Sequence, residues 1–387
     1  MPPSASDAGP LGVYVHFPFC SVRCSYCDFP TVAGQDERIA AYLDALGREI
    51  ADGQPDAAGE VDTIFFGGGT PSRMSPAQVA GVLRAIEGRF TLVADAEITL
   101  EGNPESLTDD VLAGCRDAGV NRISVGTQSL NDRVLAKAGR AHDAADARDA
   151  VTRARRTGLA SVSADLIAGL PGEDLGRWDE TLRAVAGWGP DHVSVYLLES
   201  DKDTPLGRSV RAGRTVLAGD DLMAEVYETT VDVLEGAGLA IYEISNFARP
   251  GHRSRHNLKY WTDRPYVGFG LGAHGYLGGV RRSNRVDLDG YIRAVALGEE
   301  PVAWREPYDA TRRLEEAIFL GLRTTDGIDA GVLGARYGAD LRTRYAAAWE
   351  RGEAAGLLVW EGERVRLTRA GRVRSNELFS EIVSGSL

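Results

Sequence analysis

Short runs of β-branched residues alternate with longer segments of helical spacing from Leu11 to about Ile244, and this rhythm strongly constrains the fold. Each apolar run precedes a segment rich in Ala, Leu, Arg and Asp, which is the order of repeated βα units around a parallel sheet. The expected strands span 12–16, 62–66, 97–100, 122–125, 161–167, 192–198 and 240–245. Seven such strands predict an α/β fold in the form of an incomplete or modified barrel.

The rhythm stops near residue 249, where Gly, Arg, Asn and aromatic residues become frequent. Farther along, expected helices at 310–323, 330–337 and 341–355 precede a short hairpin at 357–368, a pattern typical of a winged-helix-like domain. Five arginines make the hairpin and its flank basic, as a solvated face or as a docking surface: Arg364, Arg366, Arg369, Arg372 and Arg374. We therefore expect a flexible tail (1–10), a barrel (11–248), an irregular extension (249–304) and a C-terminal domain (305–387).

The charge and cysteine content narrow the classes of function. A formal net charge of −13 argues against nucleic acid as the main partner, because backbone binding needs concentrated positive charge. The first ten residues have neither a basic nor an apolar region of a signal peptide, and no run approaches the ~18 apolar residues of a membrane span. We expect a cytoplasmic protein, with membrane association only through a partner.

Three of the four cysteines lie within eight residues, directly after the first expected strand. The spacing Cys20-x3-Cys24-x2-Cys27 gathers three thiolates in one loop, which suits a [4Fe–4S] cluster with one iron left open for a chelating ligand. A closed zinc site would require a fourth ligand, and His16 is the nearest candidate. The remaining cysteine, Cys115, lies in an expected helix and is interpreted as a small buried apolar residue.

Other motifs fall just beyond expected strands, where barrel enzymes place their chemistry. The Gly67-Gly68-Gly69-Thr70-Pro71 segment lets the backbone approach a ligand closely, although taken alone it could be a simple strand-to-helix turn. It lacks the Lys of a phosphate-binding P-loop. Glu101 and Asp165 could accept hydrogen bonds from a ribose or an ammonium group, or they could be solvated caps.

One histidine lies in a distinctive segment, His256-Asn257-Leu-Lys-Tyr260-Trp261. An imidazole beside large flat rings could ligate the iron of a porphyrin, whereas the alternative is a buried, hydrogen-bonded histidine. His274 is a second, weaker candidate for the same role. The histidines at 142, 192 and 252 lie in no motif and are assigned to packing or to the surface.

Taken together, the Cys20–Cys27 loop and its flanks resemble the radical S-adenosylmethionine (SAM) superfamily, and in particular its coproporphyrinogen III oxidase-like members. The flanking motifs are Tyr14-Val-His-x-Pro, Gly67–Pro71, Glu101-Gly-Asn-Pro104, Gly126-Thr-Gln128-Ser, Asp165–Gly172 and the segment that starts at His256. The resemblance covers nearly the whole chain. It implies a partial (β/α)6 TIM-like barrel with a C-terminal helical, winged-helix-like domain. The residues that it implies for SAM binding are Tyr14, Tyr26, Gly68, Gly69, Thr70, Glu101, Gln128, Arg140 and Asp165.

Phe29 occupies the position of a further cysteine in the relatives that oxidise coproporphyrinogen. This departure, with the HNxxYW segment, resembles the heme-chaperone branch of the family. That branch implies a [4Fe–4S] cluster on Cys20, Cys24 and Cys27, SAM, and heme held by His256, Asn257, Tyr260 and Trp261. It implies delivery of heme to a respiratory or other hemoprotein, an electron donor, a possible homodimer and at most SAM cleavage as enzymatic activity. The alternatives are an oxygen-independent coproporphyrinogen III dehydrogenase and a non-catalytic metal-binding scaffold.

Overall fold

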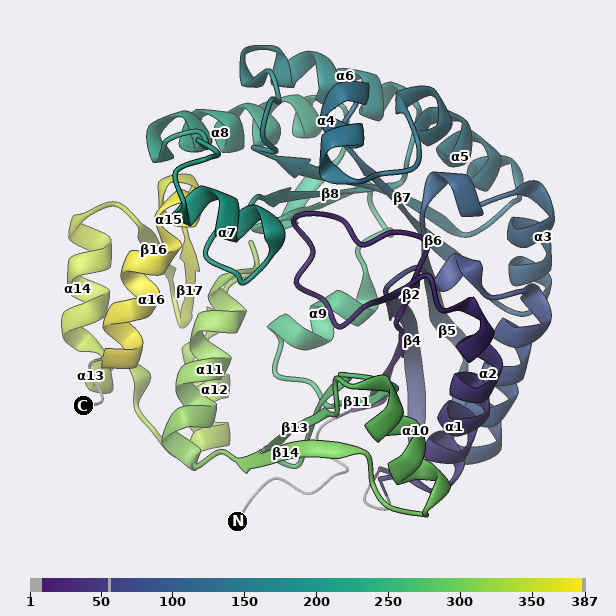
Figure 1. Ribbon diagram of the computed structural model, residues 1–387. Helices are drawn as coiled ribbons and strands as arrows, with labels where there is room; N and C mark the ends of the chain where they lie inside the picture. The colour runs from purple at the N-terminus through teal and green to yellow at the C-terminus, as the bar shows by residue number, and fades with distance from the viewer. Residues whose placement is uncertain (1–8, 55–56, 385–387) are drawn as a thin grey trace.

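The computed structural model describes residues 9–54 and 57–384, so most of the predicted tail at 1–10 lies outside the described residues. In this part of the chain, twelve strands form one sheet in the order β14-β13-β12-β11-β1-β4-β5-β6-β7-β8-β10-β9. The seven strands from β11 to β8 run parallel, and both flanks are antiparallel. The sheet curls into an open barrel (Figure 1), as predicted.

All seven expected strands are strands in the structure. They are β1 (Leu11–Phe17), β4 (Glu60–Gly68), β5 (Thr91–Gly102), β6 (Arg122–Gln128), β7 (Ser161–Ala168), β8 (His192–Leu197) and β9 (Ala240–Glu243). The last of these differs from the expected rhythm, because β9 pairs antiparallel with β10 (Asn246–Ala248) instead of continuing the parallel barrel.

Alternating residues along each barrel strand have different chemistry. On β1, Val13, Val15 and Phe17 belong to the main hydrophobic core, whereas Tyr14 and His16 lie on the other face of the strand. The later strands repeat this alternation, with small or apolar residues toward the helices and polar residues toward the interior. Because side chains alternate between faces with a period of two, a polar interior follows directly from the sequence of each strand.

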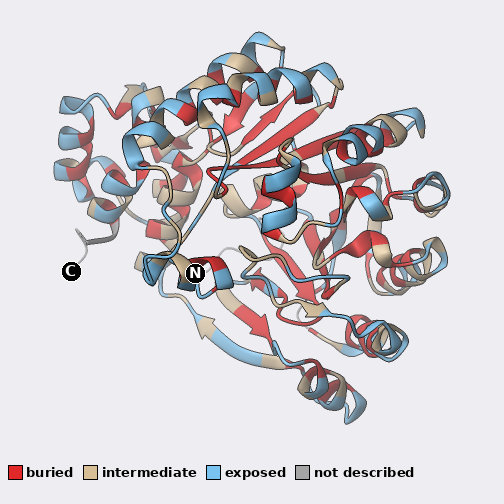
Figure 2. Cartoon of the chain, turned by 45° about the horizontal axis from the view of Figure 1, so that its top comes forward, coloured by how far each residue is buried: buried red, intermediate tan, exposed pale blue. Residues whose placement is uncertain are grey.

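The outer layer consists of helices that follow the strands, and their apolar stripes cover the sheet (Figures 1 and 2). They are α1 (Ile39–Asp52), α2 (Pro76–Arg89), α3 (Asp109–Asp117), α5 (Ala144–Arg156), α6 (Trp178–Gly187) and α8 (Asp220–Gly236). Two shorter helices, α4 (Asp132–Ala138) and α7 (Pro205–Arg211), contact the cysteine loop instead. The side chains of Ser75 and Thr108 cap the starts of α2 and α3 by accepting hydrogen bonds from the N–H groups of Gln78 and Val111. Cys115 is completely buried in the core, which confirms its apolar role. None of the helices in the described ranges is long and apolar enough to cross a membrane.

The segment at 249–304 is more regular than its composition indicated. It contains α9 (Arg255–Trp261), β11 (Tyr266–Phe269), β12 (His274–Leu277), β13 (Val280–Asn284), α10 (Leu288–Ala296) and the start of β14 (Val302–Pro307). The strands are too short to show periodicity in the sequence, and pairing with the free edge of β1 stabilises them. The helix α9 lies within the ring of strands (Figure 1).

The C-terminal region has a hydrophobic core of its own, which includes Ile318, Trp349 and Val365. Its helices are α11 (Ala310–Leu322), α12 (Ala330–Tyr337), α13 (Leu341–Arg344), α14 (Ala346–Ala354), α15 (Arg369–Val373) and α16 (Ser375–Ser384). They surround a small antiparallel sheet of β15 (Ile328–Asp329), β17 (Arg364–Leu367) and β16 (Leu358–Glu361). This arrangement agrees with a helical, winged-helix-like unit; the four-part division of the chain stays a prediction.

The basic hairpin of this region is largely neutralised by local partners. Arg366 pairs with Glu361, and Arg374 pairs with Glu377. Arg369 contacts Asp232 at 2.6 Å and Glu228 at 3.0 Å, both on α8. The arginines therefore serve in part to attach the C-terminal region to the barrel.

Candidate functional site

A cavity of about 330 Å³ opens at the carboxyl ends of the barrel strands and extends into the interior. Its wall includes the three thiols of Cys20, Cys24 and Cys27 and the two carboxyl groups of Glu101 and Asp165. The loop that carries the cysteines passes over the barrel interior in the view of Figure 1. The structure thus brings together motifs that lie up to 145 residues apart in the chain.

The predicted SAM residues from Tyr26 to Asp165 all line this cavity: Tyr26, Gly68, Gly69, Thr70, Glu101, Gln128, Arg140 and Asp165. Tyr14 lies just behind the wall, where its ring is 3.0 Å from the position that a Cβ on Gly67 would occupy. The roles of these residues in binding SAM stay predictions.

Backbone hydrogen bonds fix the cysteine loop to two neighbouring helices. Ser25 N–H donates to the carbonyl of Ala138 at the end of α4, and the Ser25 carbonyl accepts from Leu206 N–H in α7. Thr70 Oγ1 donates to Cys20 Sγ at 3.5 Å, and Arg140 Nη1 lies 3.8 Å from Cys24 Sγ. These donors stabilise negative charge on sulfur, which a thiolate ligand carries.

Burial raises the pKa of the Cys20 thiol and raises that of Cys27 to about 11. Over the described ranges, no group of three or more His, Cys, Asp or Glu side chains is arranged around a single metal-ion position. A four-iron cluster binds each thiolate on a different iron, so its ligands need not converge on one point as zinc ligands do.

His16 connects β1 with the far end of the cysteine loop. Its Nε2 lies 3.0 Å from the carbonyl oxygen of Pro30, which can only accept, so Nε2 carries the proton and Nδ1 accepts from the Tyr14 hydroxyl at 3.1 Å. Burial lowers the pKa of His16 to about 4, against the opposing effect of the Pro30 hydrogen bond. Gly68 has a φ of 113°, and a Cβ there would lie 2.6 Å from the His16 ring. The glycine-rich turn therefore requires this glycine.

Two carboxyl groups share the interior of the cavity. Burial, and secondly the charge of Asp165, raise the pKa of Glu101 to about 8, despite a hydrogen bond from Gly68 N–H. Burial likewise raises the pKa of Asp165, although three serine hydroxyls donate to it from Ser124, Ser163 and Ser194 at 2.7 to 3.1 Å. A cationic or hydroxyl-bearing ligand bound between the two groups would stabilise their ionised forms.

A polar network surrounds the end of β6. Gln128 has a φ of 64°, in the left-handed region that non-glycine residues seldom adopt. Arg140 Nη2 donates to the Gly126 carbonyl at 2.8 Å and to Asn103 Oδ1 at 2.7 Å, and Asn103 in turn donates to Thr70. Strain of this kind is tolerated where the surroundings fix the backbone, as at binding sites.

Several wall residues were not selected from the sequence, namely Asn103, Arg122, Ser124, His192 and Ser194. The serines and Arg122 occupy alternate, inward-facing positions of otherwise apolar strands, and this alternation is the signal that could have identified them. Asn103 lies within the Glu101–Pro104 motif. His192 bonds Ser163 and the Tyr242 hydroxyl, so it belongs to the packed interior.

Four exposed apolar side chains lie at the mouth of the cavity, among charged residues. Phe29 is 58% exposed and Val22 is 56% exposed on the cysteine loop, and Tyr196 and Leu197 lie exposed across from them at the end of β8. Exposed apolar surface of this kind next to a cavity is typical of a site for a flat, apolar ligand or a protein partner.

The HNxxYW segment forms α9 and fills the barrel below the cavity. His256 is completely buried, with Nδ1 2.9 Å from Thr63 Oγ1 and Nε2 2.8 Å from the Tyr260 hydroxyl. Its ring stacks on Phe65, and burial lowers its pKa to about 3. Asn257 alone of the four predicted heme residues lines the cavity. The heme role of these residues stays a prediction.

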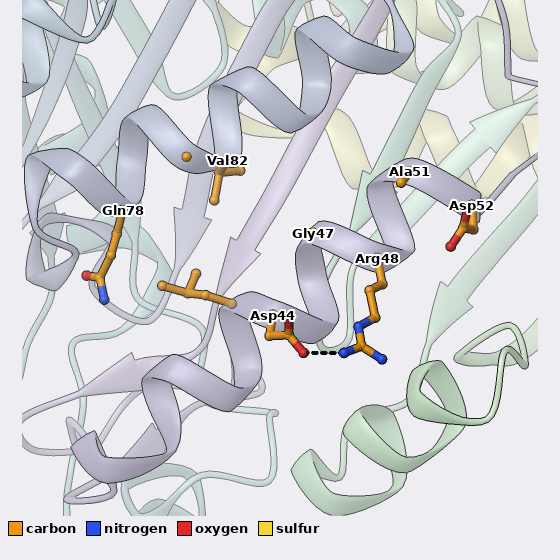
Figure 3. Close-up of a pocket in the computed structure, with 9 residues that line it drawn as sticks. Asp44, Gly47, Arg48, Ala51, Asp52, Gln78 and Val82 are labelled. Atoms are coloured by element: carbon orange, nitrogen blue, oxygen red, sulfur yellow. Dashed lines mark ion pairs between the residues drawn. The ribbon is translucent and has the colours of Figure 1, made fainter.

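A second hollow, of about 490 Å³, lies on the outer helical layer between α1 and α2 (Figure 3). An ion pair between Asp44 and Arg48 crosses its edge. The hollow exists because the side chains at three of its positions, Gly47, Ala51 and Gly81, are small or absent. It contains no cysteine or histidine, so it carries no chemistry comparable to that of the barrel cavity.

The comparisons with known proteins agree with this geometry. Residues 14–185 match the Radical SAM superfamily model, and residues 308–374 match the HemN C-terminal domain model. The fold also matches the structure of coproporphyrinogen III oxidase (HemN) from Escherichia coli, a radical SAM enzyme, with a TM-score of 0.84 at 24% identity over 96% of this chain and 90% of that one. The open barrel and its cysteine loop thus define a radical SAM protein.

Relatives that match over nearly their full length show to which family of radical SAM proteins the chain belongs. The chain is 36% identical to the heme chaperone HemW of Bacillus subtilis, over 95% of this chain and 97% of the relative. It is 38% identical to the heme chaperone HemW of Mycobacterium tuberculosis, over 97% and 95% of the two chains. The chain belongs to the HemW family of radical SAM proteins. Membership implies a [4Fe–4S] cluster and SAM as cofactors, and relates the chain to proteins that handle heme or porphyrin.

Proposed function

We propose that this protein is a radical SAM heme chaperone, which binds a [4Fe–4S] cluster and SAM in the barrel cavity and carries heme to a recipient hemoprotein. The observation that carries the proposal is the combination of three thiols, two buried carboxyls and an apolar mouth in one cavity. Heme is the cargo, and the cluster and SAM are resident cofactors.

The residues fit these cofactors chemically. Cys20, Cys24 and Cys27 supply three soft ligands, so one iron of a four-iron cluster stays open for the amino and carboxylate groups of SAM. Glu101 and Asp165 offer acceptors to the ammonium and ribose groups of SAM, and the glycine-rich turn lets the backbone approach it. When reduced, such a cluster supplies the electron that cleaves the SAM sulfonium; the protein orients SAM and excludes water.

The first test concerns the cluster. The triple variant Cys20→Ser, Cys24→Ser, Cys27→Ser should lose the iron and sulfide that the wild type takes up under anaerobic reconstitution. Cys115→Ser is the matched control, because Cys115 is a buried thiol outside the cavity. Equal iron content in the triple variant and the wild type would contradict the cluster assignment.

The second test separates the chaperone from the dehydrogenase. The reconstituted protein with SAM and reductant should bind ferric protoporphyrin IX and transfer it to an apo-cytochrome b, and it should leave coproporphyrinogen III unchanged. Phe29→Cys provides a companion variant, since it restores the cysteine of the oxidase relatives at an exposed position. Formation of protoporphyrinogen IX by the wild type would refute the chaperone proposal and make the protein a dehydrogenase.

A further inference from the structure

The histidine that ligates the heme iron can be sought by asking which imidazoles have a free nitrogen. Four of the six histidines are unavailable. His16, His192 and His256 have hydrogen-bond partners at both nitrogens, whereas His142 bonds the Thr127 carbonyl through Nε2 and keeps Nδ1 buried 3.5 Å from Glu105. For His252 and His274, the described part of the chain provides no hydrogen-bond partner to the ring. An axial ligand needs one unprotonated, unoccupied nitrogen, so these two rings are the available ones.

His256 does not fit the role in this structure. Its ring packs between Phe65 and Tyr260. Its Nδ1 is bonded to Thr63, which lies on β4 two residues before Phe65. Gly12 faces the same point, where a Cβ would lie 3.3 Å from the His256 ring. Iron could reach His256 only after α9 left the barrel and broke both hydrogen bonds, each of which is buried.

The two free rings lie at opposite ends of the barrel. The carbonyl of His252 accepts from Arg122, which begins β6, so His252 lies near the amino ends of the strands. His274 begins β12, which runs antiparallel to β11, and a Cβ on the nearby Gly272 would lie 2.5 Å from Pro30 at the end of the cysteine loop. His274 therefore lies at the same end as the cavity.

The surroundings of His274 suit a porphyrin. The residue is exposed, and its ring centroid lies 6.0 Å from that of Trp304, which is 41% exposed. Both belong to one line across the sheet, in which His274 pairs with Ser283 and Ser283 pairs with Trp304. Partial burial, then the charge of Arg281, lowers the pKa of His274 and favours its neutral form, the one that binds iron.

A cation for the propionate groups, Arg285, lies just past the end of β13, two residues beyond Ser283. The Arg285 carbonyl accepts from Gly272 N–H at 2.8 Å, and its guanidinium is exposed, with no ion-pair partner within the described ranges. Val286 is 67% exposed, and its Cγ1 lies 3.5 Å from the position that a Cβ on Gly272 would occupy. Histidine, tryptophan, arginine and an exposed aliphatic group together match the iron, ring and carboxylates of heme.

The cavity is too small to hold a porphyrin as well as SAM. Its volume of about 330 Å³ is at the lower end of the roughly 300 to 1,000 Å³ typical of small-molecule sites, which suits one nucleoside-sized ligand. Porphyrin and SAM therefore require adjoining, separate places.

We propose that heme binds on the exposed face formed by His274, Trp304 and Arg285 beside the cavity mouth, with His274 as the axial ligand in place of His256. The inference rests on the proposed heme function and names its binding site. The helix α9, which has His256 in its first turn, then has a structural role in the packed interior of the barrel.

The experiment titrates ferric protoporphyrin IX into the full-length, cluster-reconstituted protein and records the Soret band and the low-spin ferric EPR signal, together with the melting temperature. His274→Ala should remove the histidine-ligated signal and weaken binding about tenfold or more, with an unchanged melting temperature. His252→Ala is the matched control and should resemble the wild type. His256→Gln should lower the melting temperature and retain the ligated spectrum.

Iron-free protoporphyrin IX separates ligation from ring contact, because it should bind equally to the wild type and His274→Ala and more weakly to Trp304→Ala. Heme binding by the wild type with an unaltered spectrum in His274→Ala would overturn the site while leaving the chaperone function intact. Loss of the histidine-ligated spectrum in a stably folded His256→Gln variant would also overturn the proposed site and leave the chaperone function intact. A wild type that binds no heme would overturn the proposed function itself.

Discussion

Protonation of Glu101 should make the stability of the cofactor-free protein depend on pH. The pKa of Glu101 is about 8 in the fold against an ordinary value of 4.5, so between these values the folded chain holds a proton that the unfolded chain has lost. The free energy of unfolding then falls as pH rises, by about 1.4 kcal/mol per pH unit. From pH 5.5 to 7.0 the loss amounts to about 2 kcal/mol, and it levels off above pH 8.

The assay is urea unfolding of the cluster-free, reduced protein at several pH values, with Glu101→Gln as the comparison. The glutamine keeps a carbonyl acceptor for Gly68 N–H but cannot titrate, so the difference between the two curves isolates Glu101 from other buried acids. We expect the wild type to lose about 2 kcal/mol more than the variant between pH 5.5 and 7.0. Parallel curves would refute the raised pKa and the argument that burial keeps this carboxyl neutral.

Three further predictions concern particular contacts. Gly68→Ala should weaken SAM binding in calorimetry and destabilise the fold by more than Gly59→Ala, because both have positive φ but only Gly68 would place its Cβ against His16; equal effects would indicate backbone strain alone. Thr63→Val should cost about 1 to 3 kcal/mol in urea unfolding, since it removes the partner of the buried His256 Nδ1, whereas the exposed Thr91→Val should be nearly neutral. Arg369→Met should cost at most about 1 kcal/mol, because its ion pairs to Glu228 and Asp232 are partly exposed; a larger loss would mean that this contact alone holds the C-terminal region.

The parts that could be predicted from the sequence are those encoded locally. The β-branched runs of the barrel strands and the spacing of Cys20, Cys24 and Cys27 are both visible within a few residues of sequence. The strands lie where the sequence predicted them, and the cysteine loop follows the first of them. Eight of the nine SAM candidates line one cavity, because most of them lie near the carboxyl ends of barrel strands, which meet at the same end of the barrel.

The parts that could not be predicted depend on distant contacts. Nothing near His256 in the chain shows that its ring meets Thr63, 193 residues earlier, inside the barrel. The strands β11 to β14 are only four to six residues long, and their pairing partners rather than their composition make them strands. The exposure of His274 beside Trp304 likewise follows only from the register of three strands.

The pairing of β1 with β11 has a consequence for the order of folding. β1 carries the stem of the cysteine loop, yet one of its two neighbours, Tyr266 opposite Gly12, is synthesised about 250 residues later. Until then, one edge of β1 exposes unpaired backbone groups, which can pair with other chains. Such a distant contact also closes slowly. A nascent chain therefore completes the wall behind its cysteines only late in synthesis, and cofactor insertion before that point would act on an open-edged sheet.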